Sequence, residues 1–286
     1  MSCHRRICGG QREMNQVEGV LFDWAGTTID FGCFAPVKVF IKILKEAGID
    51  VTMAEARLPM GMLKRDHLKA MLEMPRINSK WIEKYGRCFN EQDIDKLYLS
   101  FESLLLMSLM EYTNPLPEVV ETVQKLREQG LKIGSTTGYT DSMMNIVTKG
   151  AQEKGYAPDF WITPDSTHSY GRPYPYMIFR NMEALQLSAP WNVVKIGDTV
   201  ADIREGLHAG VWSVGVAVGS SQMGLSFDEF ENLSEMGKNR AIHKVEQVFL
   251  DYGADFTIKT MKELPHLIGR INTLLGQGKR PHAKSS

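Results

Sequence analysis

The sequence VEGVLFDWAGTT, residues 17–28, decides the fold. Its first part is a nearly continuous apolar run that ends in Asp23, which is typical of a strand buried on both faces of a parallel sheet. Four later runs share this character, and a fifth is weaker. They are LKIGSTT (131–137), FWIT (160–163), NVVKIGDT (192–199), VWSVGVAVG (211–219) and the weaker ADFTI (254–258). We expect a strand in each.

Helical patterns separate these runs. In residues 118–129, Val119, Val123 and Leu126 fall on one face, and Gly130 follows as a C-terminal stop. Similar spacing occurs in residues 143–153, 176–187 and 202–208. Strands that alternate with helices predict an α/β fold whose core is a doubly wound, Rossmann-like parallel sheet, with ligands bound at the carboxyl ends of the strands.

The alternation is interrupted once, between the first and second strands. There Thr52 and Glu55 form a capping box and apolar residues recur at helical spacing, which predicts an inserted α-helical cap domain. Its hinges are expected at residues 31–36 and 112–118, where Gly and Pro interrupt the pattern. The expected division is a disordered extension (1–16), a Rossmann-like core (17–32 and 114–264), the cap domain (33–113), and a C-terminal helix end with a disordered basic tail (265–286). Within the core, the polar residues 220–244 are expected to be helical at the surface.

The composition is typical of a folded globular protein that acts on a small molecule. Of the 286 residues, 43% are hydrophobic and 23% are charged, and 33 basic against 34 acidic residues give a net charge of −1. A balanced charge provides no field that would attract nucleic acid or an anionic membrane. No apolar run reaches the roughly 18 residues that cross a bilayer.

The four cysteines are Cys3, Cys8, Cys33 and Cys88, too few and too scattered for a disulfide framework. This favours a reducing, cytoplasmic compartment. Residues 1–16 carry arginines without an apolar core, so they do not form a secretory signal. They fit a disordered extension better than an organelle transit peptide, and both interpretations stay open.

Acids follow two of the predicted strands. Asp23 leads into a turn where Gly26 permits close backbone approach and the Thr27 hydroxyl, with the local amides, could cradle a phosphoryl group. Asp198 ends a later strand, and Asp202 lies one helical turn further on. Carboxylates that converge at a sheet edge repel one another unless a cation lies among them, and oxygen ligands suit Mg²⁺. The alternative is that these acids cap helices.

Two more strand ends carry groups that suit an anion. Thr137 and Gly138 offer a hydroxyl and backbone amides, and Arg172 offers a fixed cation. Taken alone, each is also typical of surface structure. Together with the acids, and in this order along the chain, they resemble the haloacid dehalogenase superfamily of phosphotransfer enzymes over residues 17–260.

This resemblance implies a role for each motif. Asp23 would attack phosphorus and form an aspartyl phosphate. Thr137 and Arg172 would bind the phosphoryl group. The late acids Asp198 and Asp202 would take part in a Mg²⁺ site.

One departure from the superfamily pattern is informative. Its phosphatases usually carry an acid two positions after the nucleophile, which protonates the departing alkoxide, whereas this chain has Ala25. The segment PMGMLKRDH (59–67) offers different chemistry, because burial of Lys64 among apolar residues would favour the neutral amine that attacks carbonyls. His67 follows one helical turn later. The alternative is an ordinary solvated lysine.

Five segments closely resemble the phosphonatase family within this superfamily. They are DWAGTTIDFGCFAP (23–36), RLPMGMLKRDHL (57–68), GSTTGYT (134–140), GRPYPYM (171–177) and GDTVADIREG (197–206). The resemblance implies hydrolysis of the carbon–phosphorus bond of phosphonoacetaldehyde to acetaldehyde and phosphate, in 2-aminoethylphosphonate degradation. It implies a Schiff base on Lys64 and an aspartyl phosphate on Asp23, so that no alkoxide has to be protonated.

The same resemblance implies the remaining site residues and a partner. Mg²⁺ would be held by Asp23, the backbone carbonyl of Ala25 and Asp198, with Asp202 in support. The phosphonate would be held by Thr137, Gly138 and Arg172. His67 and Tyr139 would transfer protons or position water, and Met60, Gly61 and Cys33 would surround Lys64. The cap domain would close over the site as a lid and form a homodimer.

Two other functions stay open at this point. One is a phosphatase or phosphomutase that acts on a small phosphate ester through Asp23 without the lysine. The other is a non-catalytic phosphate-binding protein in which Ala25 marks lost activity.

Overall fold

The computed structural model describes residues 16–282. The predicted N-terminal extension therefore lies, except for Gln16, outside the described residues, as do Cys3, Cys8 and residues 283–286. Within residues 16–282, no helix combines the length and the apolar character needed to cross a membrane.

A six-stranded parallel sheet organises the described residues, with the strand order β3-β2-β1-β4-β5-β6. The strands are β1 (Gly19–Phe22), β2 (Lys132–Thr136), β3 (Phe160–Ile162), β4 (Val193–Gly197), β5 (Trp212–Val216) and β6 (Phe256–Ile258). Each lies in a run from which it was predicted, so the doubly wound α/β core is confirmed. The strand order reverses between β1 and β4, which is where such sheets bind ligands.

Helices cover both faces of the sheet, because neighbouring strand residues point to opposite sides. Val20 and Phe22 belong to one cluster of buried residues, whereas Leu21 belongs to another on the opposite face. The helices of the core are α6 (Val119–Glu128), α7 (Asp141–Glu153), α8 (Tyr176–Ala184), α9 (Val200–Ala209), α10 (Phe227–Glu231), α11 (Glu235–Asp251) and α12 (Leu264–Gly276). Short 3₁₀ helices are η1 (Leu109–Tyr112), η2 (Pro164–Thr167), η3 (Pro190–Asn192) and η4 (Met261–Glu263).

One prediction about the C-terminal part of the core holds and another needs correction. Residues 220–244 are helical at the surface in α10 and the first part of α11, and α11 runs on beyond them to Asp251 and buries Phe249 against the sheet at Gly215, where a Cβ would lie 2.2 Å from its ring. The tail is not disordered from Gly276 onward, since Lys279 N donates to the backbone oxygen of Leu274 at 2.9 Å and His282 N donates to Asp255 Oδ1 at 2.7 Å.

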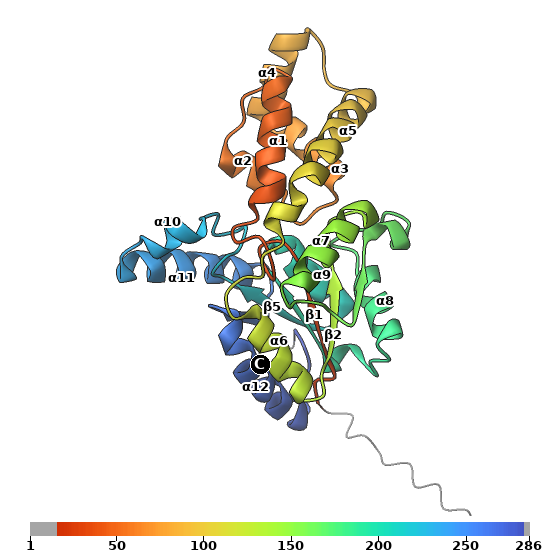
Figure 1. The fold of residues 1–286 in the computed structure, drawn as a ribbon, viewed down its shortest axis with the longest axis vertical. Helices are drawn as coiled ribbons and strands as arrows, with labels where there is room; N and C mark the ends of the chain where they lie inside the picture. The colour runs from red at the N-terminus through yellow and green to blue at the C-terminus, as the bar shows by residue number, and fades with distance from the viewer. Residues whose placement is uncertain (1–15, 283–286) are drawn as a thin grey trace, which may run out of the picture.

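Residues 34–112 are helical and stand apart from the sheet, at the top of Figure 1. Their α-helices are α1 (Phe34–Glu46), α2 (Met53–Arg57), α3 (Lys64–Glu73), α4 (Pro75–Tyr85) and α5 (Glu91–Ser108). The predicted capping box of Thr52 and Glu55 is present at the start of α2. Phe40 of α1 stacks on Phe101 of α5 with ring centroids 4.2 Å apart, which ties these two helices together. The cap-domain boundaries themselves stay a prediction.

Candidate active site

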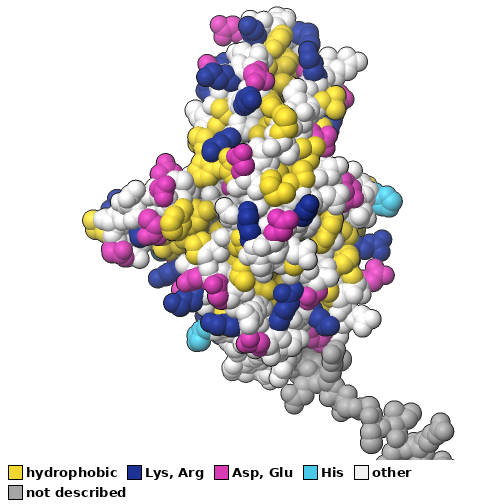
Figure 2. Space-filling view, in the orientation of Figure 1, with side chains coloured by type: hydrophobic (Ala, Val, Ile, Leu, Met, Phe, Trp, Pro, Cys, Tyr) yellow, Lys and Arg dark blue, Asp and Glu magenta, His cyan; other side chains and the backbone are white. Residues whose placement is uncertain are grey.

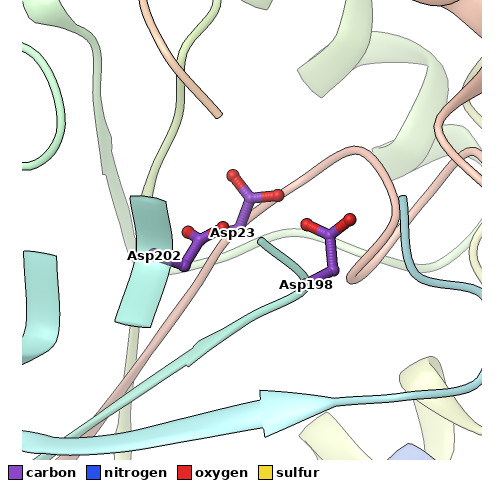
Figure 3. A group of neighbouring side chains, drawn as sticks. All are labelled: Asp23, Asp198 and Asp202. Atoms are coloured by element: carbon purple, nitrogen blue, oxygen red, sulfur yellow. The ribbon is translucent and has the colours of Figure 1, made fainter. Parts of the chain in front are cut away.

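Three carboxyl groups gather at the carboxyl ends of β1 and β4. Asp23 follows β1, Asp198 follows β4, and Asp202 lies in the first turn of α9; Figure 3 shows the three side chains side by side. Each offers an oxygen within 4.8 Å of the others. The helix-capping alternative is wrong for the first two, because α1 begins only at Phe34 and Thr199 caps α9. All three side chains are buried.

Asp198 is fixed between the strands by two donors. The Thr27 hydroxyl donates to Oδ1 at 3.1 Å and the backbone N–H of Ser221 donates to Oδ2 at 2.7 Å. The Thr27 hydroxyl therefore holds an acid and does not cradle a phosphoryl group. Burial and the neighbouring charge of Asp23 raise the pKa of Asp198 well above its ordinary value. A pair of buried carboxyl groups of this kind fits a cation between them.

Asp202 is already neutralised by protein groups. Its Oδ1 lies 2.8 Å from Lys195 Nζ and 3.0 Å from Arg172 Nη1, and its Oδ2 accepts from the Thr199 hydroxyl at 2.6 Å. Burial opposes ionisation, but the two cations keep the pKa of Asp202 below its ordinary value. Asp202 is therefore suited to support a metal site from behind.

Arg172 is buried and connects the acids. Its Nη2 lies 2.7 Å from Asp23 Oδ1 and donates to the Thr136 hydroxyl at 2.8 Å. Its Nε donates to Glu205 Oε2 at 3.0 Å. The neighbouring acids outweigh burial and raise the pKa of Arg172, so the guanidinium stays charged.

Lys64 reaches the same place from the helical insertion. It is the first residue of α3, only 5% exposed, and its Nζ lies 5.1 Å from the centre of the Tyr139 ring. The solvated-lysine alternative is therefore wrong. Burial lowers the pKa of Lys64, which favours the neutral amine. Burial likewise raises the pKa of the Tyr139 phenol well above its ordinary value, so the phenol stays protonated.

Most of these groups line one small cavity. Its lining residues are Asp23, Ala25, Cys33, Met60, Gly61, Lys64, Thr137, Gly138, Tyr139, Arg172, Asp198 and Thr199. The cavity thus gathers the residues predicted for the site except His67 and Asp202.

His67 lies beneath the cavity lining, inside the helical insertion. Its ring stacks on Phe40 with centroids 4.0 Å apart, and Nε2 lies 2.9 Å from the backbone oxygen of Ala56. Burial lowers the pKa of His67 well below its ordinary value, so the imidazole is neutral. Among the described residues, Nδ1 has no hydrogen-bond partner.

Two glycines bring the insertion against the core beside the cavity. A Cβ on Gly61, whose φ is +89°, would lie 2.5 Å from Thr199 Oγ1. A Cβ on Gly138 would lie 2.9 Å from the backbone oxygen of Met62. Both contacts require a residue without a side chain.

Four residues of this network were not predicted from the sequence: Thr136, Lys195, Thr199 and Glu205. A signal for Lys195 existed, because a lysine within the apolar run 192–199 must find a partner when the strand is buried. Glu205 lies three residues after Asp202, on the same side of a helix, which is a weaker signal.

The parallel-sheet fold and this arrangement of acids, arginine and lysine identify the class of protein to which the chain belongs. The family model of the haloacid dehalogenase-like hydrolases matches residues 17–210, and the chain belongs to that family of hydrolases. The phosphonoacetaldehyde hydrolase of Lysinibacillus sphaericus is 56% identical over 257 residues, which cover 90% of this chain and 96% of that relative. Within the class, the chain belongs to the phosphonoacetaldehyde hydrolase family, which confirms the resemblance expected from its motifs.

Solved structures agree with this assignment. A phosphonoacetaldehyde hydrolase-like protein from Oleispira antarctica superimposes with a TM-score of 0.90 at 35% identity, covering 98% of this chain and 100% of that one. A β-phosphoglucomutase from Clostridium difficile reaches a TM-score of 0.65 at 17% identity, covering 91% of this chain and 100% of that one. The second likeness shows a shared fold alone.

Proposed function

We propose that this enzyme hydrolyses the carbon–phosphorus bond of phosphonoacetaldehyde to acetaldehyde and phosphate, in 2-aminoethylphosphonate degradation. The observation that carries the proposal is the meeting of Lys64 and Asp23 in one small cavity, with Ala25 where a proton donor for an alkoxide would otherwise stand. An amine for the aldehyde and a carboxylate for phosphorus are the two groups that this reaction needs.

The first step joins Lys64 to the aldehyde. The neutral amine, favoured by burial, adds to the carbonyl carbon, and loss of water with uptake of one proton from solvent gives a protonated imine. Arg172 and the backbone amides near Thr137 and Gly138 hold the phosphonate at the other end of the substrate.

The second step breaks the carbon–phosphorus bond. A carboxylate oxygen of Asp23 attacks phosphorus, and the electron pair of the broken bond moves into the imine to form an enamine. This electron sink replaces the proton that an alkoxide would require, which explains Ala25. Protonation of the enamine carbon and hydrolysis then release acetaldehyde and Lys64, while water frees phosphate from the aspartyl phosphate of Asp23. We assign proton transfer or water positioning to Tyr139. To His67 we assign packing inside the helical insertion that keeps Lys64 in position.

The acidic cluster fits a divalent metal, and we propose Mg²⁺. Asp23, the backbone carbonyl of Ala25 and Asp198 would hold it, and Asp202 would support them through its contacts with Lys195 and Thr199. The ion would neutralise phosphonate charge and the repulsion between the carboxylates, so that Asp23 can approach an anion.

The two alternatives fit the site less well. A phosphatase or phosphomutase would leave the buried lysine unused and would lack an acid at Ala25. A non-catalytic phosphate-binding protein would need neither Lys64 nor an attacking carboxylate at Asp23.

The test is release of acetaldehyde from phosphonoacetaldehyde in the presence of Mg²⁺. Asp23→Asn and Lys64→Arg should each lower kcat by at least about a thousandfold, because each removes a covalent step. Borohydride should trap a substrate adduct on Lys64 in the unmodified chain and in Asp23→Asn. Lys69→Arg, an exposed lysine of α3 paired with Glu91, is the matched control and should keep full activity. Full turnover by Lys64→Arg would overturn the imine.

We further propose a homodimer formed through the helical insertion. Leu99 and Met107 of α5 are 67% and 72% exposed, which is unusual for large apolar side chains. Figure 2 shows apolar side chains over this upper part of the molecule and at its junction with the core.

A cytoplasmic location remains our proposal. Within residues 16–282, Cys33 and Cys88 are free thiols, and Cys88 is exposed. Free exposed thiols suit a reducing compartment.

A further inference from the structure

Glu205 contacts the substrate-binding arginine without lining the cavity. Its side chain is fully buried on α9, and Oε2 accepts from Arg172 Nε at 3.0 Å and from the Thr136 hydroxyl at 2.9 Å. The Thr136 hydroxyl accepts in turn from Arg172 Nη2 at 2.8 Å. Three residues from β2, α9 and the loop before α8 thus close a ring of hydrogen bonds.

This ring of hydrogen bonds fixes one edge of the Arg172 guanidinium, and the terminal nitrogens of the group face the acids of the active site. The side with Nε and Nη2 faces Glu205 and Thr136, whereas the terminal nitrogens Nη1 and Nη2 also face Asp202 at 3.0 Å and Asp23 at 2.7 Å. A planar group fixed along one side cannot rotate in its plane. Nη2 therefore stays directed at Asp23, the acid that must reach phosphorus, and Nη1 stays directed at Asp202.

Glu205 also balances buried charge around the arginine. Lys195 Nζ lies 2.8 Å from Asp202 Oδ1 and 3.5 Å from Glu205 Oε2, so Asp202 and Glu205 each lie against both buried cations, Arg172 and Lys195. Without Glu205, the acidic partners of Arg172 would be Asp202 and Asp23. Arg172 would then lose the contact that directs its Nε.

We propose that Glu205 is a positioning residue that orients Arg172 for the phosphonate, with Thr136 closing the ring. This inference rests on the proposed role of Arg172 in binding the phosphonate. It requires Glu205 to affect the phosphoryl end of the substrate and to leave the aldehyde end, at Lys64, undisturbed.

The experiment measures the two ends separately in Glu205→Gln. Isothermal titration with inorganic phosphate in the presence of Mg²⁺ reports the phosphoryl end, and borohydride trapping of acetaldehyde on Lys64 reports the aldehyde end. We expect the Kd for phosphate to rise at least tenfold and the trapping yield to stay within twofold. An unchanged Kd, or an equal loss at both ends, would overturn the proposal, because a merely structural role weakens both.

Two further variants keep the test decisive. Thr136→Val opens the ring without removing a charge, so the Kd for phosphate should rise severalfold; an unchanged Kd would refute the proposal even if Glu205→Gln fails to fold. Ser213→Ala is the control. It removes a buried hydrogen bond to the backbone oxygen of Ile203 on α9, the helix that carries Glu205, and should change neither the Kd for phosphate nor the trapping yield. Neither measurement needs turnover, so a chain that binds phosphate but cannot cleave phosphonoacetaldehyde would contradict the proposed function and still test Glu205.

Discussion

Gly61 lets the helical insertion touch the core at the edge of the cavity. In Gly61→Ala the new methyl group would meet Thr199 Oγ1 and the Cβ of Ala201, at 2.5 and 2.8 Å, and the positive φ adds strain. The segment that carries Lys64 must then move away from Asp23. We expect kcat/KM for phosphonoacetaldehyde to fall at least tenfold, with a parallel loss of borohydride trapping.

Gly86→Ala is the matched control for this substitution. Gly86 ends α4 with a φ of +67°, but nothing lies within 4 Å of an added Cβ. It should cost about 1 kcal/mol in stability and leave kcat/KM unchanged. An equal loss of activity in both variants would show that backbone strain, and not the contact with Thr199, is responsible.

At this scale the sequence predicted which residues meet but not how they pair. Motif order was sufficient to bring Asp23, Thr137 and Arg172 to one edge, because parallel strands end together. It could not show that Arg172 has three acidic partners, Asp23, Asp202 and Glu205, because the order of motifs along a chain does not reveal which side chains pair. His67 was predicted at the reacting groups, whereas burial places it one layer below them.

Asp30 controls how the first helix of the insertion begins. Its carboxylate accepts from the backbone N–H groups of Phe34 and Ala35, at 3.0 Å each, so it caps α1 from three residues before the N-cap position. Burial, opposed by these hydrogen bonds and by Arg57, raises the pKa of Asp30 from 3.8 to about 6. The folded chain therefore binds this proton more tightly than the unfolded chain.

The sign of the pH effect follows from this difference. The contribution of Asp30 to stability is fully present below pH 3.8 and is lost as the pH rises through about 6. Asp30→Asn does not titrate. Between pH 4 and pH 8 the unmodified chain should lose about 2 kcal/mol relative to Asp30→Asn, measured by urea unfolding.

The control for this measurement is Asp251→Asn, an exposed carboxylate at the end of α11. It accounts for the loss of one negative charge from the surface. A constant difference between the unmodified chain and Asp30→Asn over this pH range would contradict the prediction.

Whole elements were predictable wherever one physical signal dominated. The strands were found because burial on both faces leaves continuous apolar runs. The full length and burial of α11 were missed, because Ile242, Val245 and Phe249 are sparse apolar residues in a polar segment. Residues 277–282 were predicted to be disordered from composition alone, which does not reveal the hydrogen bond between His282 and Asp255.

At the scale of the molecule, the two ends of the substrate are handled by separate parts of the chain. The sheet edge carries the groups for phosphorus, and the helical insertion carries the amine for the aldehyde (Figure 1). Catalysis therefore depends on how the insertion is held, and a dimer formed through it would fix its orientation.

The dimer can be tested on the exposed face of α5. Leu99→Glu combined with Met107→Glu places two charges on side chains that are 67% and 72% exposed, so the fold should tolerate them. Sedimentation velocity should show the unmodified chain as a dimer and the double variant as a monomer. Leu250→Glu, at an exposed apolar residue of α11, should remain dimeric. A monomeric unmodified chain would refute the dimer.

The ion pair between Asp23 and Arg172 has a consequence for the proposed reaction. The cation proposed to bind the phosphonate lies against an oxygen of the acid proposed to attack it. A neutral aldehyde cannot compete for the guanidinium, whereas a dianion can. We therefore expect a molecule with a phosphonate-like charge to free the Asp23 carboxylate as it binds, so that charge exchange at Arg172 selects among aldehydes before any bond is broken.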